Sequence, residues 1–577
     1  MARQYRVVDH IVEHLAAIGV SHIFGVDGAN IEDLYDAAHF QPDVTAVLAK
    51  HEFSAATMAD GYSRSGAGLG VVAATSGGGS LNLVPGLGEA LASRVPVLAL
   101  IGQPPTALDG RGSFQDTSGR NGALNAEALF SSVSLHCERV SSATEISAAL
   151  ARAVAVARRG GPSVLLLPKD IQQAKVDCAA VGDAVGHNQI GDPHPIVRAL
   201  HRTVGPVTIV AGEQVARDDA RAELEQLRAA LRARVATVPD AKDTAGTPGL
   251  GSSSALGVTG VMGHPGVADA IAGSGLCLLV GTRLPVTART GLDEALASVP
   301  TVSLGSAPPY LPCTHVHTDD LKGSLTLLTL ALTGSGKPAG IRVPDAVPRT
   351  ELTPPPYDGP GVRYRDAMAV LDSVLPDGAD IVADAGNTGA AAIHYLPARR
   401  GGRFVVALGM GGMGYSFGAG IGIAFGAMSA RAKTQQQSRG RTVVIAGDGS
   451  FFMHGMEIHT AIEYELPVTF VLFNNNAHAM CLTREQLFYD DLYSYNRFRP
   501  ANLGAGLAAM FPGLASVDVR EAADLPAAMR TALDAPGPSV VSIECAADEI
   551  PPFAPFLGGL SQHPSNEENS SNVVART

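Results

Sequence analysis

Residues 443–480 read VVIAGDGSFFMHGMEIHTAIEYELPVTFVLFNNNAHAM and combine two strand patterns with one helix pattern. An apolar, β-branched run at 443–445 meets Gly447-Asp448-Gly449, and a second apolar run at 468–473 meets three asparagines. A helix is expected between them, over about residues 455–464. The pattern is that of a β-α-β unit, in which the two parallel strands end at the same edge of the sheet.

Asp448 and Asn475 follow these two strands, so they should arrive side by side where open α/β sheets bind ligands. A carboxylate and an amide oxygen suit a hard cation such as Mg²⁺, which fills its octahedron with water and phosphate oxygens. The flanking glycines allow backbone N–H groups to approach a phosphate. The predicted ligand is therefore a metal-bridged diphosphate.

The motif GDGSF…NNN resembles the diphosphate-binding signature of the thiamine diphosphate (ThDP) enzymes. By that resemblance Asp448, Asn475 and the backbone carbonyl of Ala477 would be the metal ligands. The same resemblance implies that neighbouring residues contact the cofactor, namely Gly447, Gly449, Ser450, His478 and Met480. The alternative is a chance combination of a Gly-Asp-Gly turn with an Asn-rich turn.

A second motif lies near the N-terminus, where residues 49–64 read AKHEFSAATMADGYSR. Glu52 opens a helix there, and a carboxylate at a helix start is often a cap. However, HE…A..MADGY.R resembles the pyrimidine-domain signature of the ThDP enzymes. The resemblance gives Glu52 the role of the glutamate that hydrogen-bonds the aminopyrimidine ring and serves as the acid–base group of the cofactor.

Two nearby loops are candidates for the substrate side. The loop with Asp27, Gly28 and Ala29 occupies the place of the family's glycine-rich loop, with Asp27 where a proline is usual. Residues 112–116 resemble the substrate-facing segment of the acetohydroxyacid synthases, which makes Gln115 a catalytic candidate. Each loop could also be a simple turn.

Polar and glycine-rich turns also follow two strands expected in the C-terminal third. Asn387 and Thr388 come after the strand at 380–383, where the family contacts the diphosphate. Residues 409–414 formally match GxGxxG, but no acidic residue ends a strand about 20 positions later, as a dinucleotide site would require. The segment instead resembles the one in which a hydrophobic residue, here Met413, props the bent cofactor and backbone near Gly411 holds the pyrimidine.

Arg484 and His478, which follow the predicted metal loop, are candidates for contact with the substrate. Arg484 falls where acetohydroxyacid synthases carry a tryptophan, and its guanidinium would suit a carboxylate or phosphate on the acceptor. An exposed surface arginine is the alternative. His478 is a candidate proton donor or acceptor on the substrate side.

Alternating apolar runs and helical patterns predict an α/β fold with three doubly wound parallel-sheet domains. The expected segments are a pyrimidine-binding domain (1–180), a central domain (190–340), a Pro-rich linker (341–361), a diphosphate-binding domain (362–556) and a flexible tail (557–577). The central domain resembles the one that holds FAD in acetohydroxyacid synthases. Gly305-Ser306 stands where an acidic residue would bind a ribose, so FAD is not favoured.

Bulk composition limits the partners and the cellular location that are expected for this protein. A net charge of −13 argues against nucleic acid, and no apolar run is long enough to span a membrane. The six cysteines are far apart, without a CxxC pair, which suits the cytoplasm. The resemblance implies a homodimer or a dimer of dimers in which Glu52 and Asp448 meet across the interface.

The expected activity is ThDP- and Mg²⁺-dependent decarboxylation of a 2-oxo acid, followed by carboligation to an acceptor carbonyl, as in acetolactate synthases. Residues 455–458 also resemble 2-hydroxyacyl-CoA lyases and oxalyl-CoA decarboxylases. A simple 2-oxo acid decarboxylase, a FAD-dependent oxidase and a catalytically silent ThDP-binding homologue remain open as well.

Overall fold

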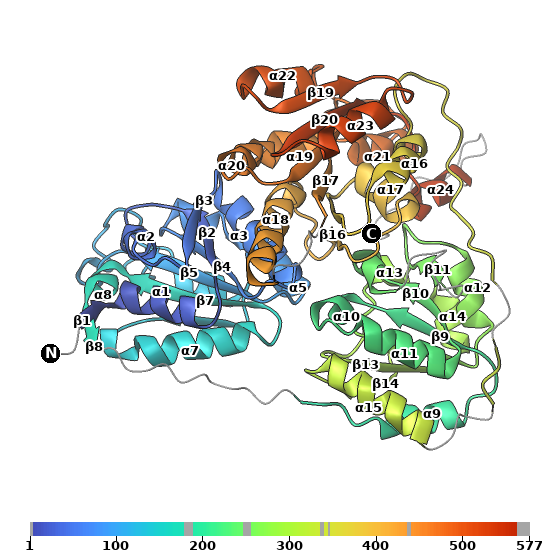
Figure 1. Cartoon of the computed structure of the whole chain (residues 1–577), viewed down its shortest axis with the longest axis horizontal. Helices are drawn as coiled ribbons and strands as arrows, with labels where there is room; N and C mark the ends of the chain where they lie inside the picture. The colour runs from blue at the N-terminus through green and yellow to red at the C-terminus, as the bar shows by residue number, and fades with distance from the viewer. Residues whose placement is uncertain are drawn as a thin grey trace.

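The computed structural model describes residues 4–177, 189–245, 255–334, 340–343, 347–434 and 440–561. It contains three parallel sheets of six strands each, with helices packed on their faces (Figure 1). The N-terminal sheet lies at the left of the figure, the central sheet at the lower right and the C-terminal sheet at the top. The expected α/β class with three doubly wound sheets is confirmed.

The N-terminal sheet has the strand order β3-β2-β4-β5-β7-β6. Every strand in it is buried between helices except at the edges, which explains the continuous apolar runs. Its elements are β2 (His22–Val26), β3 (Thr45–Leu48), β4 (Gly70–Ala74), β5 (Val97–Gln103), β6 (His136–Arg139) and β7 (Pro162–Pro168), with helices α1 (Val7–Ala17), α2 (Glu32–His39), α3 (Glu52–Arg64), α4 (Gly78–Leu81), α5 (Val84–Ala92), α6 (Ala126–Ser131), α7 (Ile146–Ala157) and α8 (Lys169–Gln173). A short ribbon, β1 (Gln4–Arg6) with β8 (Lys175–Asp177), flanks the sheet.

The C-terminal sheet has the strand order β16-β15-β17-β18-β20-β19. Numbered along the chain within each domain, its six strands follow the same order as those of the N-terminal sheet, so the two sheets share one topology. Its strands are β15 (Asp380–Ala383), β16 (Phe404–Val406), β17 (Thr442–Gly447), β18 (Val468–Asn474), β19 (Ala515–Val519) and β20 (Ser539–Glu544). The helices are α16 (Tyr364–Val374), α17 (Asn387–Tyr395), α18 (Tyr415–Thr434), α19 (Asp448–His454), α20 (Ile458–Glu463), α21 (Ala479–Phe488), α22 (Leu503–Met510), α23 (Leu525–Leu533) and α24 (Ala554–Ser561).

The central sheet has the order β11-β10-β9-β12-β13-β14. Its strands are β9 (Val207–Ala211), β10 (Arg234–Thr237), β11 (Ala255–Val258), β12 (Leu276–Val280), β13 (Thr301–Gly305) and β14 (Thr314–His317). The helices are α9 (His194–His201), α10 (Glu213–Arg217), α11 (Arg221–Leu231), α12 (Gly266–Ala272), α13 (Val286–Arg289), α14 (Asp293–Ser298) and α15 (Leu321–Gly334).

Two local expectations were wrong. The helix expected from about residue 455 begins at Asp448, and a 3₁₀ turn, η4 (Gly455–Glu457), separates α19 from α20. The predicted tail also starts too early, because residues 557–561 belong to α24, where Phe556 is 1% exposed and anchors the helix. The remainder of that tail lies outside the described residues.

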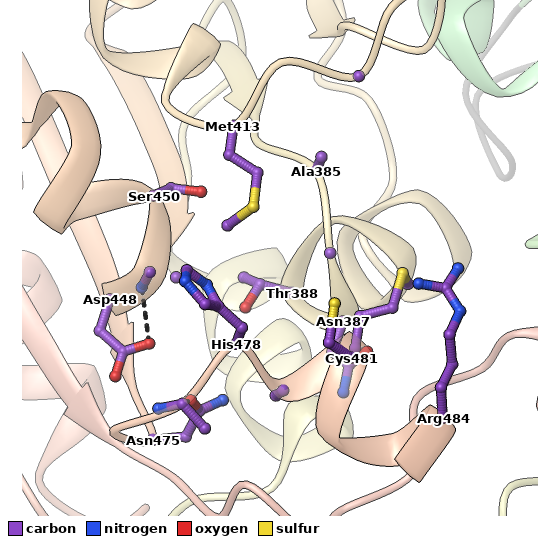
Figure 2. A pocket seen from close by; sticks show the side chains of 17 residues that line it. Ala385, Asn387, Thr388, Met413, Asp448, Ser450, Asn475, His478, Cys481 and Arg484 are labelled. Atoms are coloured by element: carbon purple, nitrogen blue, oxygen red, sulfur yellow. Dashed lines mark hydrogen bonds between the residues drawn. The ribbon is translucent and has the colours of Figure 1, made fainter. Parts of the chain in front are cut away.

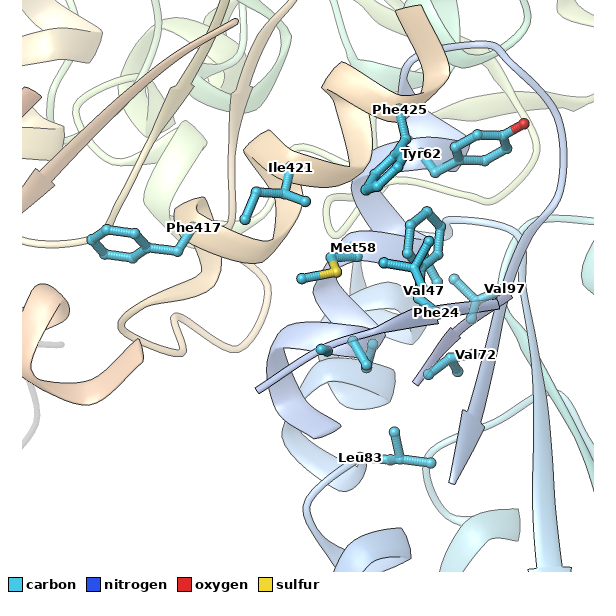
Figure 3. Packing of buried hydrophobic residues seen from close by; sticks show 14 of the residues in the cluster. Phe24, Val47, Met58, Tyr62, Val72, Leu83, Val97, Phe417, Ile421 and Phe425 are labelled. Carbon is cyan, nitrogen blue, oxygen red and sulfur yellow. The ribbon is translucent and has the colours of Figure 1, made fainter. Parts of the chain in front are cut away.

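Helices α3 and α18 join the N-terminal and C-terminal domains (Figure 3). Phe417, Ile421 and Phe425 on α18 belong to the same buried cluster as Met58 and Tyr62 on α3. The backbones approach so closely that a Cβ built at Gly422 would lie 2.0 Å from the carbonyl oxygen of residue 58. Small residues at this crossing therefore permit the contact.

Buried charges hold the central domain to both neighbours. Arg403 of the C-terminal domain bonds to Asp243 (2.5 Å) and Glu213 (3.0 Å) of the central domain. The guanidinium of Arg403 also donates to the backbone carbonyl of Arg64 on α3. The three domains therefore meet at a single ionic junction.

Candidate active site

A cavity of about 210 Å³ lies at the carboxyl edge of the C-terminal sheet (Figure 2). It sits where the loops after β15, β16, β17 and β18 converge, next to the point where the strand order reverses between β15 and β17. Such a switch point is the usual ligand site of an open α/β sheet. Thirteen lining residues are ones that the sequence analysis singled out: Asn387, Thr388, Gly411, Met413, Gly447, Asp448, Gly449, Ser450, Asn475, Ala477, His478, Met480 and Arg484.

Asp448 is the buried carboxylate of this cavity, at 1% exposure. Its Oδ1 accepts the N–H of Gly449 at 2.9 Å, whereas its Oδ2 is buried and has no hydrogen-bond partner in the described part of the chain. Burial raises the pKa of Asp448 to about 7, although backbone N–H groups of 475–477 and Gly449 oppose the shift. A buried carboxylate with an unsatisfied oxygen is suited to a cation.

The asparagine loop lies beside this carboxylate. The Asn475 side-chain oxygen accepts the N–H of Ala477 at 3.1 Å, and its Nδ2 donates to the hydroxyl of Tyr364 at 3.4 Å. Asn476 adopts a left-handed φ of 54°, which turns the chain sharply before Ala477. The side-chain oxygen of Asn475 can accept a second interaction, so the donor set fits Mg²⁺.

The N-terminus of α17 forms the wall opposite the metal loop. Asn387 and Thr388 are 3% and 4% exposed, and the buried side-chain oxygen of Asn387 has no partner within the residues that the structure describes. The preceding Gly386 has a φ of 105°, a conformation that favours glycine. Free N–H groups at the start of a helix suit a phosphate, so these residues fit a diphosphate.

Met413 and His478 define the shape of the cavity between these walls. Figure 2 shows the Met413 side chain reaching from its loop towards His478. A Cβ built at Gly449 would lie 3.3 Å from the Met413 methyl and 2.5 Å from His478 Nδ1, so only glycine fits there. Burial lowers the pKa of His478, whose Nδ1 has no partner among the described residues.

Arg484 stands across the cavity from Asp448, at the far end of the view in Figure 2. It lies on α21 one turn after Cys481, is exposed, and its guanidinium carbon is 6.0 Å from the centre of the Phe556 ring. The side chain therefore lines the cavity while remaining accessible to a ligand.

Glu52 and the other N-terminal candidates belong to the N-terminal domain, at the start of α3 and in loops around the N-terminal sheet. The helix cap of α3 comes from His51, whose Nδ1 accepts the N–H of Phe53 at 3.0 Å. Glu52 is half-buried, and its Oε2 accepts from Asn82 Nδ2 at 2.9 Å. The carboxylate of Glu52 is thus turned towards Asn82 instead of capping its own helix.

Gln115 and the 27–29 loop lie at the same edge of the N-terminal sheet. Gln115 has a left-handed φ of 61°, and its Oε1 accepts from the Thr75 hydroxyl at 3.1 Å. A Cβ at Gly28 would lie 2.8 Å from Thr75, so this loop packs on the same threonine. Asp27 Oδ1 accepts the N–H of Gly28 at 2.7 Å, and the carbonyl of Ala29 accepts from Lys169 at 2.7 Å.

The structure therefore gathers the candidates into two groups instead of one. All residues that line the cavity fall between 385 and 484, and Glu52, Gln115 and the 27–29 loop are not among them. The sequence analysis missed four lining residues, Ala385, Gly386, Ala479 and Cys481. All four lie within two residues of a residue that was singled out, so extending each motif by two residues would have found them.

At the end of β13 in the central domain, Ser306 follows Gly305, as expected from sequence. The N–H of Ser306 donates to the Gln214 side chain at 2.8 Å, and Arg217 is 3.4 Å from its hydroxyl. These contacts do not test whether FAD binds. That FAD is not favoured therefore stays a prediction.

Three family models match this chain in order. They are the N-terminal TPP-binding domain of thiamine pyrophosphate enzymes at residues 5–123, the central domain at 195–308 and the C-terminal TPP-binding domain at 384–543. The chain therefore belongs to the thiamine pyrophosphate enzymes, in which it is a ThDP-dependent carboligase or decarboxylase of the acetolactate synthase branch. The resemblance drawn from the sequence is confirmed.

Relatives of known description support that branch. The chain is 29% identical to the acetolactate synthase isozyme 2 large subunit of Escherichia coli K12, covering 95% of this chain and 96% of that protein. It is 28% identical to a probable acetolactate synthase large subunit of Methanocaldococcus jannaschii, covering 83% and 82%. In fold it resembles a putative thiamin diphosphate-dependent enzyme of Mycobacterium smegmatis, with a TM-score of 0.77, 21% identity and coverage of 94% and 100%.

Proposed function

We propose that this protein catalyses the Mg²⁺- and ThDP-dependent decarboxylation of a 2-oxo acid and joins the remaining acyl unit to an acceptor carbonyl. The observation that carries the proposal is the buried Oδ2 of Asp448, which lies beside Asn475 in the cavity and has no partner among the residues described. Relatives described as acetolactate synthases support the carboligation step.

The roles of the residues follow from their chemistry. Asp448, Asn475 and the carbonyl of Ala477 would hold the Mg²⁺, and Asn387 and Thr388 would bind the diphosphate. When bound, ThDP supplies an electron sink that accepts the electrons released as CO₂ leaves. Glycine at 449 would leave space between these cofactor-binding residues and the substrate.

The acceptor side is proposed to include His478 and Arg484. Neutral His478 could exchange a proton with the acceptor oxygen, since burial holds its pKa below the ordinary value. Arg484 would pair with a carboxylate on the acceptor through two parallel hydrogen bonds. An anionic 2-oxo acid acceptor is therefore favoured over a neutral aldehyde.

A second copy of the chain is proposed to complete the site. Glu52 is absent from the lining of the cavity that holds Asp448, yet ThDP chemistry needs an acid–base group. A symmetric dimer would bring the N-terminal edge of one chain to the C-terminal edge of its partner. Met410, Phe452 and Met453, which are 64%, 53% and 50% exposed on the C-terminal domain, would be covered there.

The setting is proposed to be the cytoplasm. The five described cysteines are free thiols, in keeping with a reducing compartment. Within the described residues, no helix combines the length and apolar character needed to cross a bilayer.

The test is CO₂ release from a panel of 2-oxo acids by purified protein with ThDP and Mg²⁺, with and without carbonyl acceptors. The expected result is release that Glu52→Gln abolishes and that one acceptor accelerates. Arg484→Ala should raise KM for an anionic acceptor roughly tenfold or more, while release without acceptor stays unchanged. Bound ThDP without release from any acid would contradict the proposal and favour an acyl-CoA substrate or a silent homologue.

A further inference from the structure

The loop from Ala407 to Gly414 connects β16 with α18 and carries Met413 into the cavity. Half of its eight residues are glycines, and Gly411 and Gly414 have φ values of 66° and 88°. Glycine loses the most conformational freedom on folding, so such a loop is costly to hold in one shape. Contacts from outside the loop must therefore fix the position of Met413.

A buried glutamate on the N-terminal domain holds the first part of the loop. Glu89 on α5 is 2% exposed. Its Oε2 accepts the N–H of Met410 at 2.6 Å and that of Gly411 at 3.3 Å, and its Oε1 accepts that of Gly409 at 3.2 Å. Ser93, one turn later on α5, donates to Oε1 at 2.6 Å and keeps the carboxylate aimed at the loop.

A buried aspartate holds the other end. Asp384, at the end of β15, is 1% exposed and accepts the N–H groups of Gly414 (3.0 Å) and Ser416 (2.9 Å). It also accepts from the hydroxyl of Ser450, a residue of the cavity, at 2.8 Å. Hydrogen bonds to ionised acceptors are about twice as strong as neutral ones, so Met413 lies between two firmly held segments.

We propose that Glu89 is a positioning residue for the cofactor site, which acts from the N-terminal domain by fixing the backbone of 409–411 and thereby Met413. Glu89 does not line the cavity, and it lies on the other domain of the same chain. The inference rests on the proposed function only in taking the cavity of Met413 as the ThDP site.

The first test uses cofactor-free protein and hydrogen–deuterium exchange. Glu89→Gln preserves the shape of the side chain but places an NH₂ group against N–H donors. Amide exchange at 409–411 should rise roughly tenfold or more, while exchange at 414–416, which Asp384 holds, stays as in the wild type. Glu127→Gln, on the exposed face of α6, is the matched control and should change neither segment.

The second test uses ThDP and Mg²⁺ with isothermal titration calorimetry and steady-state kinetics. Glu89→Gln should weaken ThDP binding roughly tenfold and lower kcat tenfold to a hundredfold, since small displacements at a reacting site are costly. If Glu89→Gln does not fold, Ser93→Ala removes only the bond that aims the carboxylate, and it should raise exchange at 409–411 to a smaller extent.

Unchanged exchange at 409–411 in both variants would overturn the proposal. Faster exchange with wild-type affinity and kcat would also overturn it, because the loop would then be held without consequence for the site. A wild-type protein that binds no ThDP would instead contradict the proposed function, which the calorimetry of the wild type alone decides.

Discussion

At Asp448 the protein keeps a carboxylate in an environment that favours its neutral form. Its pKa of about 7 lies well above the ordinary 3.8, so without a metal its contribution to stability is complete below pH 3.8 and is lost as the pH rises from there through 7. Asp448→Asn should therefore raise the melting temperature of the metal-free protein at pH 8 by about 2–4 °C. The same variant should no longer gain stability from Mg²⁺ and ThDP.

Thermal unfolding with and without Mg²⁺ and ThDP checks this prediction. Asp490→Asn removes an equal charge from an exposed position and should behave like the wild type in both conditions. A normal ligand-induced rise in the melting temperature of Asp448→Asn would contradict the role of Asp448 as a metal ligand.

Residues at the ends of parallel strands could be placed from sequence, because the β-α-β pattern puts Asp448 and Asn475 at one edge. Asp384 directly follows the strand expected at 380–383, but three of its hydrogen bonds, from Gly414, Ser416 and Ser450, join segments that only the folded sheet brings together. No motif or pattern in the sequence around Glu89 indicated a role for this residue. The loop N–H groups that it binds lie more than 300 positions away in the chain, so no periodicity or spacing could predict this contact.

Among elements, the packing of α3 against α18 requires glycine at the crossing. A side chain on Gly422 would meet the backbone of Met58 at 2.0 Å, and backbone cannot move aside cheaply. Gly422→Ala should therefore destabilise the protein by roughly 1–3 kcal/mol, despite the better helix propensity of alanine.

The matched control for this prediction is Gly506→Ala in the middle of α22, where a Cβ would meet nothing within 4 Å. That variant should be neutral or more stable by about 0.5–1 kcal/mol. Thermal unfolding of the two variants checks the difference, and equal melting temperatures would refute the close packing.

A stacked histidine pair links α17 to the central domain. The rings of His264 and His394 are 4.6 Å apart, and His394 Nε2 accepts the N–H of Leu352 at 3.1 Å. Burial lowers the pKa of His394 to about 4, so the ring is neutral when folded. Its contribution to stability is complete above the ordinary 6.5 and is lost as the pH falls through 4.

Acidification from pH 7 to 4 should therefore cost roughly 2–3 kcal/mol at this interface. Urea unfolding at several pH values checks this, with His394→Phe expected to be less stable at pH 7 and to show a flatter pH dependence. His459→Gln, at an exposed position on α20, should retain the wild-type dependence. A wild-type slope in His394→Phe would disprove the assignment.

At the scale of the whole molecule, the three-sheet fold was predictable because each strand is an apolar run between helices. The repeated order of the N-terminal and C-terminal sheets was not, since strand order depends on tertiary packing. This repetition gives each chain two corresponding sheet edges, one with Glu52 and one with Asp448. The central claim is that these edges form one ThDP site only between two copies.

The most direct test is subunit complementation between Glu52→Gln and Asp448→Asn chains. The two variants, co-expressed with different tags, are purified as the mixed dimer and assayed for CO₂ release with ThDP and Mg²⁺. A site shared between chains leaves one of the two sites intact, so about half of the wild-type activity should return. A dimer of the double variant with a wild-type chain should be inactive. Inactive complementing dimers, with half-activity in that second dimer, would contradict the account.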